Sequence, residues 1–386
     1  NFGYNGSERL AAGQRFEFFP AVSAGWVASS EKFWEPISKY INHFKIRGSY
    51  GLVGSDAFAS GAPHFLYQNN IGIGSAHKFW TGLPTSEISK QGPGFYVLAV
   101  QDAGWEHVKK FDIGFDMMLF DQLNITFDYF HDKRERILMS RASWPSMLGY
   151  WGSKPWSNIG EVENQGFELS LNWTKQFGKD LTLDLRGNFT YNQNEYKYVD
   201  EPSYPYVWQT NTGKPLNTVK GYIAEGLFAS EEEIANSPDQ SQLGDGQITT
   251  EDQVMISSYD WHPRIQYGFG LNIVYKNFDL GVFFNGSAKR KIMINSGIAP
   301  FLSGGGDGEE AETLARNLMQ WIADDHWSVD NPNPNAAYPR LGLTKADVTN
   351  NVQPSTFWLR NGNFLRFKTL EIGYRLPYCR IYLSGD

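Results

Sequence analysis

The stretch Phe111–Tyr129, FDIGFDMMLFDQLNITFDY, contains two runs in which every second residue is apolar. Between the runs stand Asp121 and Gln122, where the polar residues favour a turn. Successive side chains of a β-strand point to opposite faces, so each run predicts a strand with one apolar and one polar face. Together the two runs predict an antiparallel hairpin.

The same alternation recurs along most of the chain and predicts about ten antiparallel strands. Most runs last roughly 9–16 residues, which is longer than the five or six residues of an ordinary strand. A strand that crosses a lipid bilayer at a tilt needs about 9–11 residues. The predicted strands are 18–29, 44–54, 108–120, 123–138, 161–176, 181–195, 264–276, 278–290, 358–376 and 379–386.

The connections between these strands are short on one side and long on the other. Tight turns are expected at 121–122, 176–180, 276–277 and 376–378, with a longer link over 30–43 on the same side. Long polar segments are expected near 55–107, 139–160, 196–262 and 291–357. Outer-membrane barrels have this asymmetry, with short periplasmic turns and long extracellular loops. A soluble β-sandwich also alternates, but it rarely combines such long strands with such long loops.

The composition supports a membrane barrel. Aromatic residues make up 16% of the 386 residues, and barrels carry aromatic girdles at both lipid interfaces. No run approaches about 18 apolar residues, so we expect no transmembrane helix. The net charge is −8 without a cluster of Lys and Arg, so we expect no nucleic-acid partner. Cys379 is the only cysteine, which excludes an intrachain disulfide.

Five segments resemble motifs of the SusC/RagA family of TonB-linked outer-membrane proteins, in the same order along the chain. They are Phe18–Trp26 (FFPAVSAGW), Phe44–Gly51 (FKIRGSYG), Asn158–Glu168 (NIGEVENQGFE), Asn331–Leu341 (NPNPNAAYPRL) and Trp358–Lys368 (WLRNGNFLRFK). Each motif alone is moderately specific, whereas their shared order over nearly the whole chain is highly specific. The chain is therefore similar to the barrel of a TonB-dependent receptor.

The resemblance implies an all-β fold, a transmembrane antiparallel barrel of about 22 strands, of which residues 1–386 would be the C-terminal portion. It implies that a plug domain, a TonB-binding segment, a signal peptide and the closing strand lie outside this sequence. It also implies contact with outer-membrane lipid and energy from the TonB complex. The family imports glycans or peptides with a SusD-like lipoprotein as a lid. We therefore expect glycan import without a cofactor, with peptides or another ligand as the alternative.

Enzymatic motifs do not emerge. The seven histidines form no H-E-x-x-H pattern, and the sequence contains no G-x-S-x-G elbow, P-loop or G-x-G-x-x-G fingerprint. Two further hypotheses are a non-transporting glycan-binding β-domain and an outer-membrane hydrolase. A soluble domain would stay monodisperse without detergent, and a hydrolase would need a nucleophile and a base on neighbouring strands.

Aromatic residues cluster in the expected loops, where barrels place recognition, and sugar rings stack on aromatic planes. The alternative is that these rings pack the loops or join the outer girdle. The candidate ligand-binding residues are Trp80, Tyr150, Trp151, Trp156, Tyr206 and Trp208. Polar residues of the strands would point inward, to face the plug or line the substrate path, and we favour the plug. These inward residues are Asp128, Glu168, Asp184, Arg186 and Asn188.

The segment Ser241–Ile248 (SQLGDGQI) resembles a family loop that looks like half of an EF-hand. Asp245 and Asp252 fit ligand positions 5 and 12 of a calcium loop. Leu243 stands at ligand position 3 and has no side-chain oxygen. We therefore expect a tight Asp-Gly turn rather than a calcium site.

Overall fold

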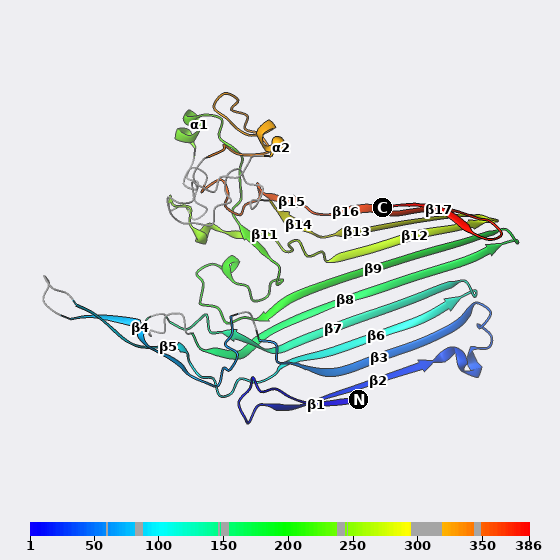
Figure 1. The fold of residues 1–386 in the computed structure, drawn as a ribbon, viewed down its shortest axis with the longest axis horizontal. Coiled ribbons are helices and arrows are strands. Elements are labelled where there is room, and N and C mark those ends of the chain that lie inside the picture. Colours follow the sequence, from blue (N-terminus) through cyan, green and yellow to red (C-terminus); the bar gives the residue numbers. More distant parts are fainter. Residues whose placement is uncertain are drawn as a thin grey trace.

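A computed structural model describes residues 1–58, 61–81, 88–145, 147, 154–237, 244, 246–294, 319–342 and 349–386, and for 73–81, 88–91, 93 and 95 the backbone alone. One continuous antiparallel sheet of eleven strands dominates the described residues (Figure 1). In spatial order its strands are β1 (Phe2–Gly6), β2 (Phe16–Val27), β3 (Ile41–Ser55), β6 (Glu106–Leu119), β7 (Leu123–Ser140), β8 (Trp156–Phe177), β9 (Leu181–Tyr198), β12 (Ile265–Tyr275), β13 (Phe278–Ala288), β16 (Phe364–Arg375) and β17 (Arg380–Gly385).

The prediction of an all-β antiparallel barrel wall is confirmed, and each of the ten predicted strands is present. The sheet has one further strand, β1, whose five residues are too few for an alternating pattern to stand out. The predicted strand 358–376 is divided at Gly362 and Asn363, because Gly362 N–H donates to the carbonyl of Arg290 instead of continuing the sheet.

Tight turns and long connections lie at opposite ends of the sheet, as predicted (Figure 1). The β6–β7 turn places Phe120 and Asp121 at φ 55°, and the β12–β13 turn places Lys276 at φ 53°. Left-handed residues of this kind match the twist of two paired strands, so they make the tightest hairpins. The link from β2 to β3, at the same end, forms two short 3-10 helices, η1 (Ala28–Ser30) and η2 (Lys32–Trp34).

The long connections contain structure that the sequence analysis did not predict. The connection from β3 to β6 forms a hairpin of β4 (Asn70–Thr81) and β5 (Ile88–Val97). The remaining elements of the described residues are the strands β10 (Val219–Gly221), β11 (Val254–Ser257) and β14 (Lys291–Met293), the helices α1 (Glu231–Asn236) and α2 (Gln320–Asp324), and the 3-10 helices η4 (Val207–Gln209) and η5 (Thr250–Asp252). β14 pairs with β15 (Leu359–Asn361), the first part of the predicted strand 358–376. Neither α-helix in the described ranges is long and apolar enough to cross a bilayer.

The strand register separates apolar from polar side chains. Ile125 pairs with Leu171 and Phe127 with Leu169, whereas Thr126 between them pairs with Ser170. We call the face of Ile125 and Phe127 the outer face and the face of Thr126 the inner face. Across the strands the outer face carries a row of phenylalanine rings whose centroids lie 5.6–6.1 Å apart: Phe115, Phe127, Phe167 and Phe189.

The apolar outer face is open rather than packed into a core. Near the tight turns Tyr275 is 51% exposed, Phe278 58% and Leu383 75%. A soluble sandwich would bury this face between two sheets, whereas a membrane barrel turns it toward lipid. The predicted alternation on β7, β8, β9 and β12 is thus confirmed, and the inner face is the lumenal one.

Toward the long connections the outer face becomes polar. Lys109 lies 2.5 Å from Glu135, and Lys197 lies 3.1 Å from Glu163 and 3.0 Å from Glu195. Apart from Lys197, which sits at a bulge, these residues continue the alternation of the outer face on β6 to β9. Charged side chains are stable in water and costly in the hydrocarbon core of a membrane. The row of ion pairs therefore marks the outer limit of the membrane on these strands. We call these five residues the polar row.

Candidate ligand-binding surfaces

Two long connections, 199–264 and 289–363, fold together at the loop end of the sheet. Tyr222 and Ser355 form a parallel β-bridge, and Ala224 N–H donates to Thr356 Oγ1 at 2.9 Å. Figure 1 shows α1 of the first connection and α2 of the second in the same region, away from the sheet. We call the described parts of both connections the loop unit.

Trp358 anchors the loop unit and explains the first residue of the WLRNGNFLRFK motif. Its side chain is fully buried, and its indole N–H donates to the carbonyl of Asn351 at 2.6 Å. Phe357 and Tyr338 pack against its ring with centroids 4.9 and 6.3 Å away. A tryptophan with its N–H satisfied contributes more apolar contact area than any other side chain, so Trp358 stabilises the fold of this loop.

The candidate residues Tyr206 and Trp208 form a stacked pair in the loop unit. Their ring centroids lie 4.6 Å apart with the planes inclined by 11°, and both side chains are half-buried. The indole N–H of Trp208 donates to the carbonyl of Glu251 at 3.3 Å, while Val207, which separates the two residues in the sequence, is 81% exposed. The pair is therefore fixed against the loop and partly open to solvent.

Charged groups hold the turn that carries this pair. Lys214 Nζ donates to the carbonyl of Trp208 at 2.7 Å, and Lys220 Nζ donates to that of Gln209 at 2.5 Å. Burial lowers the pKa of Lys220, and Glu201 opposes that effect. Burial alone would raise the pKa of Glu201, but hydrogen bonds from the backbone of Asn211 and Thr212 outweigh it and the pKa is lowered. Positively charged lysines and a negatively charged glutamate thus hold the turn in one conformation.

The other candidate aromatics are placed differently. Trp156 begins β8 and packs against the buried cluster of Leu66, Ala103 and Leu138. Trp80 lies in β4, opposite Ser89 of β5, and only its backbone is described. Tyr150 and Trp151 lie outside the described residues, so their roles stay predictions.

Of the two calcium candidates, the structure describes Asp252. Its carboxylate accepts the N–H of Thr249 at 2.7 Å and forms a capping box at the start of η5. Asp245 lies outside the described residues. Within the described ranges, no three His, Cys, Asp or Glu side chains gather as metal ligands would.

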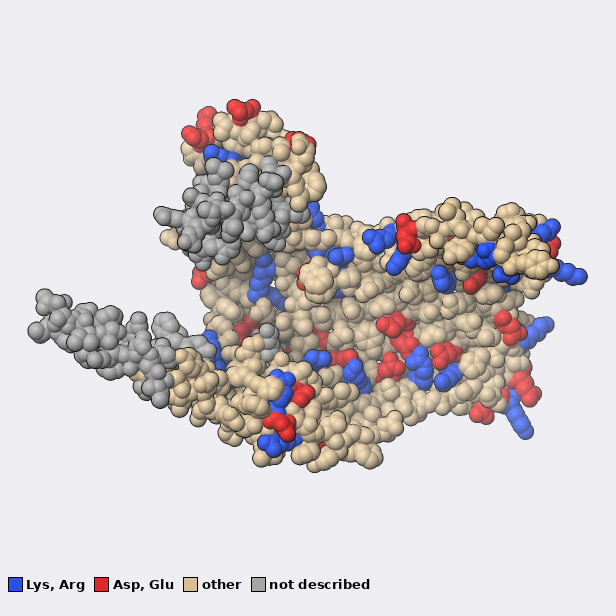
Figure 2. Space-filling view, in the orientation of Figure 1, with Lys and Arg blue, Asp and Glu red and all other residues tan. Residues whose placement is uncertain are grey.

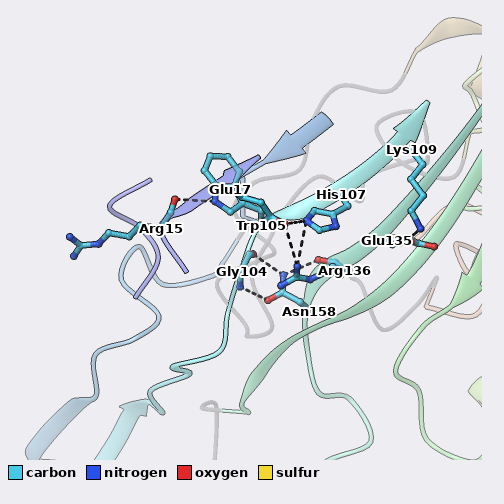
Figure 3. Close-up of polar contacts among 9 residues, drawn as sticks. All are labelled: Arg15, Glu17, Gly104, Trp105, His107, Lys109, Glu135, Arg136 and Asn158. Atoms are coloured by element: carbon cyan, nitrogen blue, oxygen red, sulfur yellow. Dashed lines mark hydrogen bonds and ion pairs between the residues drawn. The ribbon is translucent and has the colours of Figure 1, made fainter. Parts of the chain in front are cut away.

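A polar cluster joins β2, β6, β7 and β8 at their loop ends (Figure 3). His107 Nε2 lies 2.7 Å from the Glu17 carboxylate, and the Arg136 guanidinium lies 3.9 Å from it. Asn158 donates to the carbonyls of Gly104 and Arg136 at 3.0 and 2.8 Å and accepts the N–H of Gly104 at 2.9 Å. Asn158, the first residue of the NIGEVENQGFE motif, therefore closes a bulge at which Arg136 has φ 57°.

Arg47 centres an ion cluster on the inner face. Its guanidinium lies 2.6 Å from Asp128, 3.2 Å from Asp116 and 3.8 Å from Asp112. Figure 2 shows acidic and basic side chains gathered over the middle strands. A hollow of about 300 Å³ adjoins the cluster and is lined by Ser23, Gly25, Lys45, Gly48 and Ser49 among others. Sequence reasoning placed Asp128 inward but missed Arg47, because only the register brings the two together.

The register also confirms the inward position of the other predicted residues. Asp128 pairs with Glu168, and Asp184 pairs with Asn272. Arg186 lies opposite Gly270 and Asn188 opposite Gly268. All of these positions alternate with the exposed apolar set, so they lie on the inner face.

Residues 1–293 match the family model described as TonB dependent receptor-like, beta-barrel. The chain belongs to this family. Members are outer-membrane proteins that act as receptors and transporters rather than enzymes, so the resemblance drawn from the five motifs is confirmed.

Individual relatives agree with the family. TonB-dependent receptor P3 of Formosa agariphila is 26% identical over 99% of this chain and 38% of its own length. TonB-dependent receptor SusC of Bacteroides thetaiotaomicron is 23% identical over 96% of this chain and 35% of its own length. The chain thus spans little more than a third of these relatives.

A solved structure has the same fold. The RagAB peptide importer in its closed-closed state superposes with a TM-score of 0.68 at 20% identity, over 99% of this chain and 41% of that chain. At this identity the likeness concerns the fold alone.

Proposed function

We propose that this chain forms part of the barrel of a TonB-dependent importer, which carries a nutrient across the outer membrane with energy from the TonB complex. The observation that carries this proposal is the loop unit above a polar inner face. Two connections joined by Tyr222 and Ser355 make a shared surface at the rim. This arrangement suits capture of a hydrated solute at the rim, followed by passage along a polar wall.

The solute that the loop unit fits best is a glycan. Tyr206 and Trp208 are already ordered by Lys214 and by each other, so ligand stacking on their free surface costs little conformational entropy. Trp156 is a weaker candidate, since it packs into a buried cluster. Peptides are the second candidate, because the similar RagAB structure is that of a peptide importer. A soluble glycan-binding domain fits poorly, because the outer face is apolar and exposed.

A SusD-like lipoprotein is the partner that we propose for the rim. The loop unit exposes large apolar side chains, among them Ile223 at 62%, Trp321 at 56% and Val329 at 74%. Exposed apolar anchors in an extracellular loop suit a protein interface, in which tryptophan is an enriched contact residue.

The test begins with deletion of the gene in its host bacterium. Growth is then measured on a panel of oligosaccharides and peptides as sole carbon sources. We expect loss of growth on one glycan class, and loss of solute accumulation when the proton gradient is collapsed. Unchanged growth on every source would refute the importer.

The aromatic pair is tested in the full-length protein. Replacing Tyr206 and Trp208 with Ala should weaken solute capture by on the order of 1–3 kcal/mol while the barrel still assembles. Tyr378→Ala is the matched control, because this fully exposed tyrosine lies at a tight turn at the other end of the sheet. Normal capture by the double variant would remove the pair from the site. Co-purification of a lipoprotein with the wild type tests the partner.

A further inference from the structure

Two arginines of the inner face, Arg186 and Arg366, lie on the strands beside the loop unit. Arg186 of β9 lies opposite Gly270, and Arg366 of β16 lies opposite Asn285. Both are exposed, and neither forms an ion pair with a carboxylate of the described residues. Arg47, by contrast, is surrounded by three aspartates. The arginine pair is therefore positive charge that this part of the wall does not neutralise.

Arg186 is held in place without a carboxylate. Gly268 and Gly270 have no side chains, so β12 leaves room on the inner face beside Arg186. The ring of Phe283 lies over these two glycines. A Cβ built on Gly270 would come within 2.9 Å of Phe283 Cδ2. The guanidinium of Arg186 sits 4.9 Å from the centre of that ring. A ring orders a guanidinium and leaves its N–H donors free, so Arg186 is preorganised to bind an anion.

The arginine pair lies beneath the loop unit. β9 continues into connection 199–264, and β13 and β16 are the two strands that flank connection 289–363. A solute released from the loop unit therefore enters the lumen along the strands that carry Arg186 and Arg366.

We infer that Arg186 and Arg366 form a binding subsite for carboxylate groups of a solute that passes through the lumen. The two residues stand on strands three spacings apart, and the register places Arg186 two residues farther from the loop end than Arg366, so their backbones lie about 16 Å apart. One small acid cannot bridge them easily, whereas an extended solute with several carboxylates can contact both. This inference rests on the proposed import function.

The test measures binding of labelled probes to the purified full-length protein. One probe pair is an oligogalacturonate and its neutral methyl ester, and the other is tetraglutamate and tetraglutamine. We expect the wild type to bind at least one acidic probe about tenfold or more tightly than its neutral counterpart, with a preference that falls as salt rises. The acidic probe that is preferred distinguishes a glycan from a peptide source.

Three variants identify the residues responsible. Arg186→Gln with Arg366→Gln should abolish the preference, whereas Arg186→Lys with Arg366→Lys should keep part of it, because the charge remains. Lys45→Gln is the control, since it removes one inner-face charge outside the arginine pair. The inference is overturned if the wild type has no preference, if the Gln variant keeps it, or if Lys45→Gln loses it equally.

Binding is measured without energy from TonB, so this result and the growth result can differ. Unchanged growth of the deletion strain, together with an intact acidic preference of the purified protein, would refute the importer and leave the subsite standing. A Gln variant that binds normally but opens the lumen to proteases would show that the arginines hold another part of the protein, which also overturns the inference.

Discussion

Tyr222 and Ser355 lie in different connections of the sheet and pair as parallel β-strands. Tyr222 N–H donates to the carbonyl of Pro354 at 2.8 Å, and its own carbonyl accepts the N–H of Thr356 at 2.9 Å. Since β10 also pairs with β11, the second connection extends a small sheet of the first. The two connections should therefore fold and unfold as one unit.

Replacing Trp358 with Ala tests that cooperativity. Loss of a fully buried tryptophan costs on the order of 3–5 kcal/mol, and here the loss falls on the loop unit rather than the barrel wall. We expect limited proteolysis to cleave within 199–264 as well as within 289–363, while the heat-modifiable gel mobility of the barrel is unchanged. Trp261→Ala, at a 60% exposed position, is the control. Cleavage confined to 289–363 would contradict the single unit.

Arg47→Ala tests the inner-face ion cluster. Asp112, Asp116 and Asp128 would lose their shared cation and repel one another. We expect a loss of about 1–3 kcal/mol in unfolding free energy, less than for a dry ion pair because the lumen is wet. Urea unfolding followed by gel mobility measures it.

A second substitution makes that test specific to charge. Asp128→Asn in the Arg47→Ala background should recover part of the loss, since one repelling carboxylate is gone. A double variant that is less stable than Arg47→Ala would rule out repulsion as the cause.

Acid should loosen the link between two loops at Asp200. Burial would raise the pKa of Asp200, but hydrogen bonds from Ser143 and the charge of Arg141 outweigh burial, and the pKa is lowered. A lowered carboxyl pKa gives stability that is present above the unfolded value, about 3.9, and is lost as pH falls through the folded value. We expect the Ser143 amide to keep its protection from hydrogen exchange from about pH 8 down to about pH 5, and to lose it as the pH falls through the lowered pKa of Asp200, below about 3.9. In the Asp200→Asn variant this loss of protection at acid pH should vanish.

Gly166→Ala should damage assembly of the wall. A Cβ at Gly166 would lie 2.0 Å from the carbonyl oxygen of Tyr191 on β9, and the backbone there cannot move without breaking the ladder. Gly187→Ala is the matched control, because its nearest neighbour would be 3.8 Å away. The amount of folded barrel in the outer membrane is measured for both. Equal amounts would show that β8 and β9 adjust to the clash.

The strands could be predicted from the sequence because a barrel wall depends on a period of two. A shift of one residue would turn Phe127 to the lumen and Asp128 to the lipid, so the pattern alone determines the faces. The tight turns could be predicted for the same reason, because they join the ends of alternating runs.

The sites could not be predicted in the same way, because their partners are distant in the sequence. Arg47 meets Asp116 and Asp128 across separations of 69 and 81 residues. Trp156 resembles a ligand-binding residue in the sequence, yet its neighbours Leu66 and Ala103 come from another loop. Short strands such as β10 have three residues, too few for any periodic signal.

The polar row has a consequence for the height of the molecule. On β8 the polar row lies at Glu163, and the strand extends seven residues beyond it, to Trp156. At about 3.4 Å per residue and a tilt near 40°, those residues rise roughly 18 Å. The wall on β8 therefore stands about 18 Å above the hydrocarbon. A lipoprotein seated on its top and anchored in the surrounding leaflet would need a spacer of at least about five extended residues. Shortening that spacer should detach the lid while leaving both proteins folded.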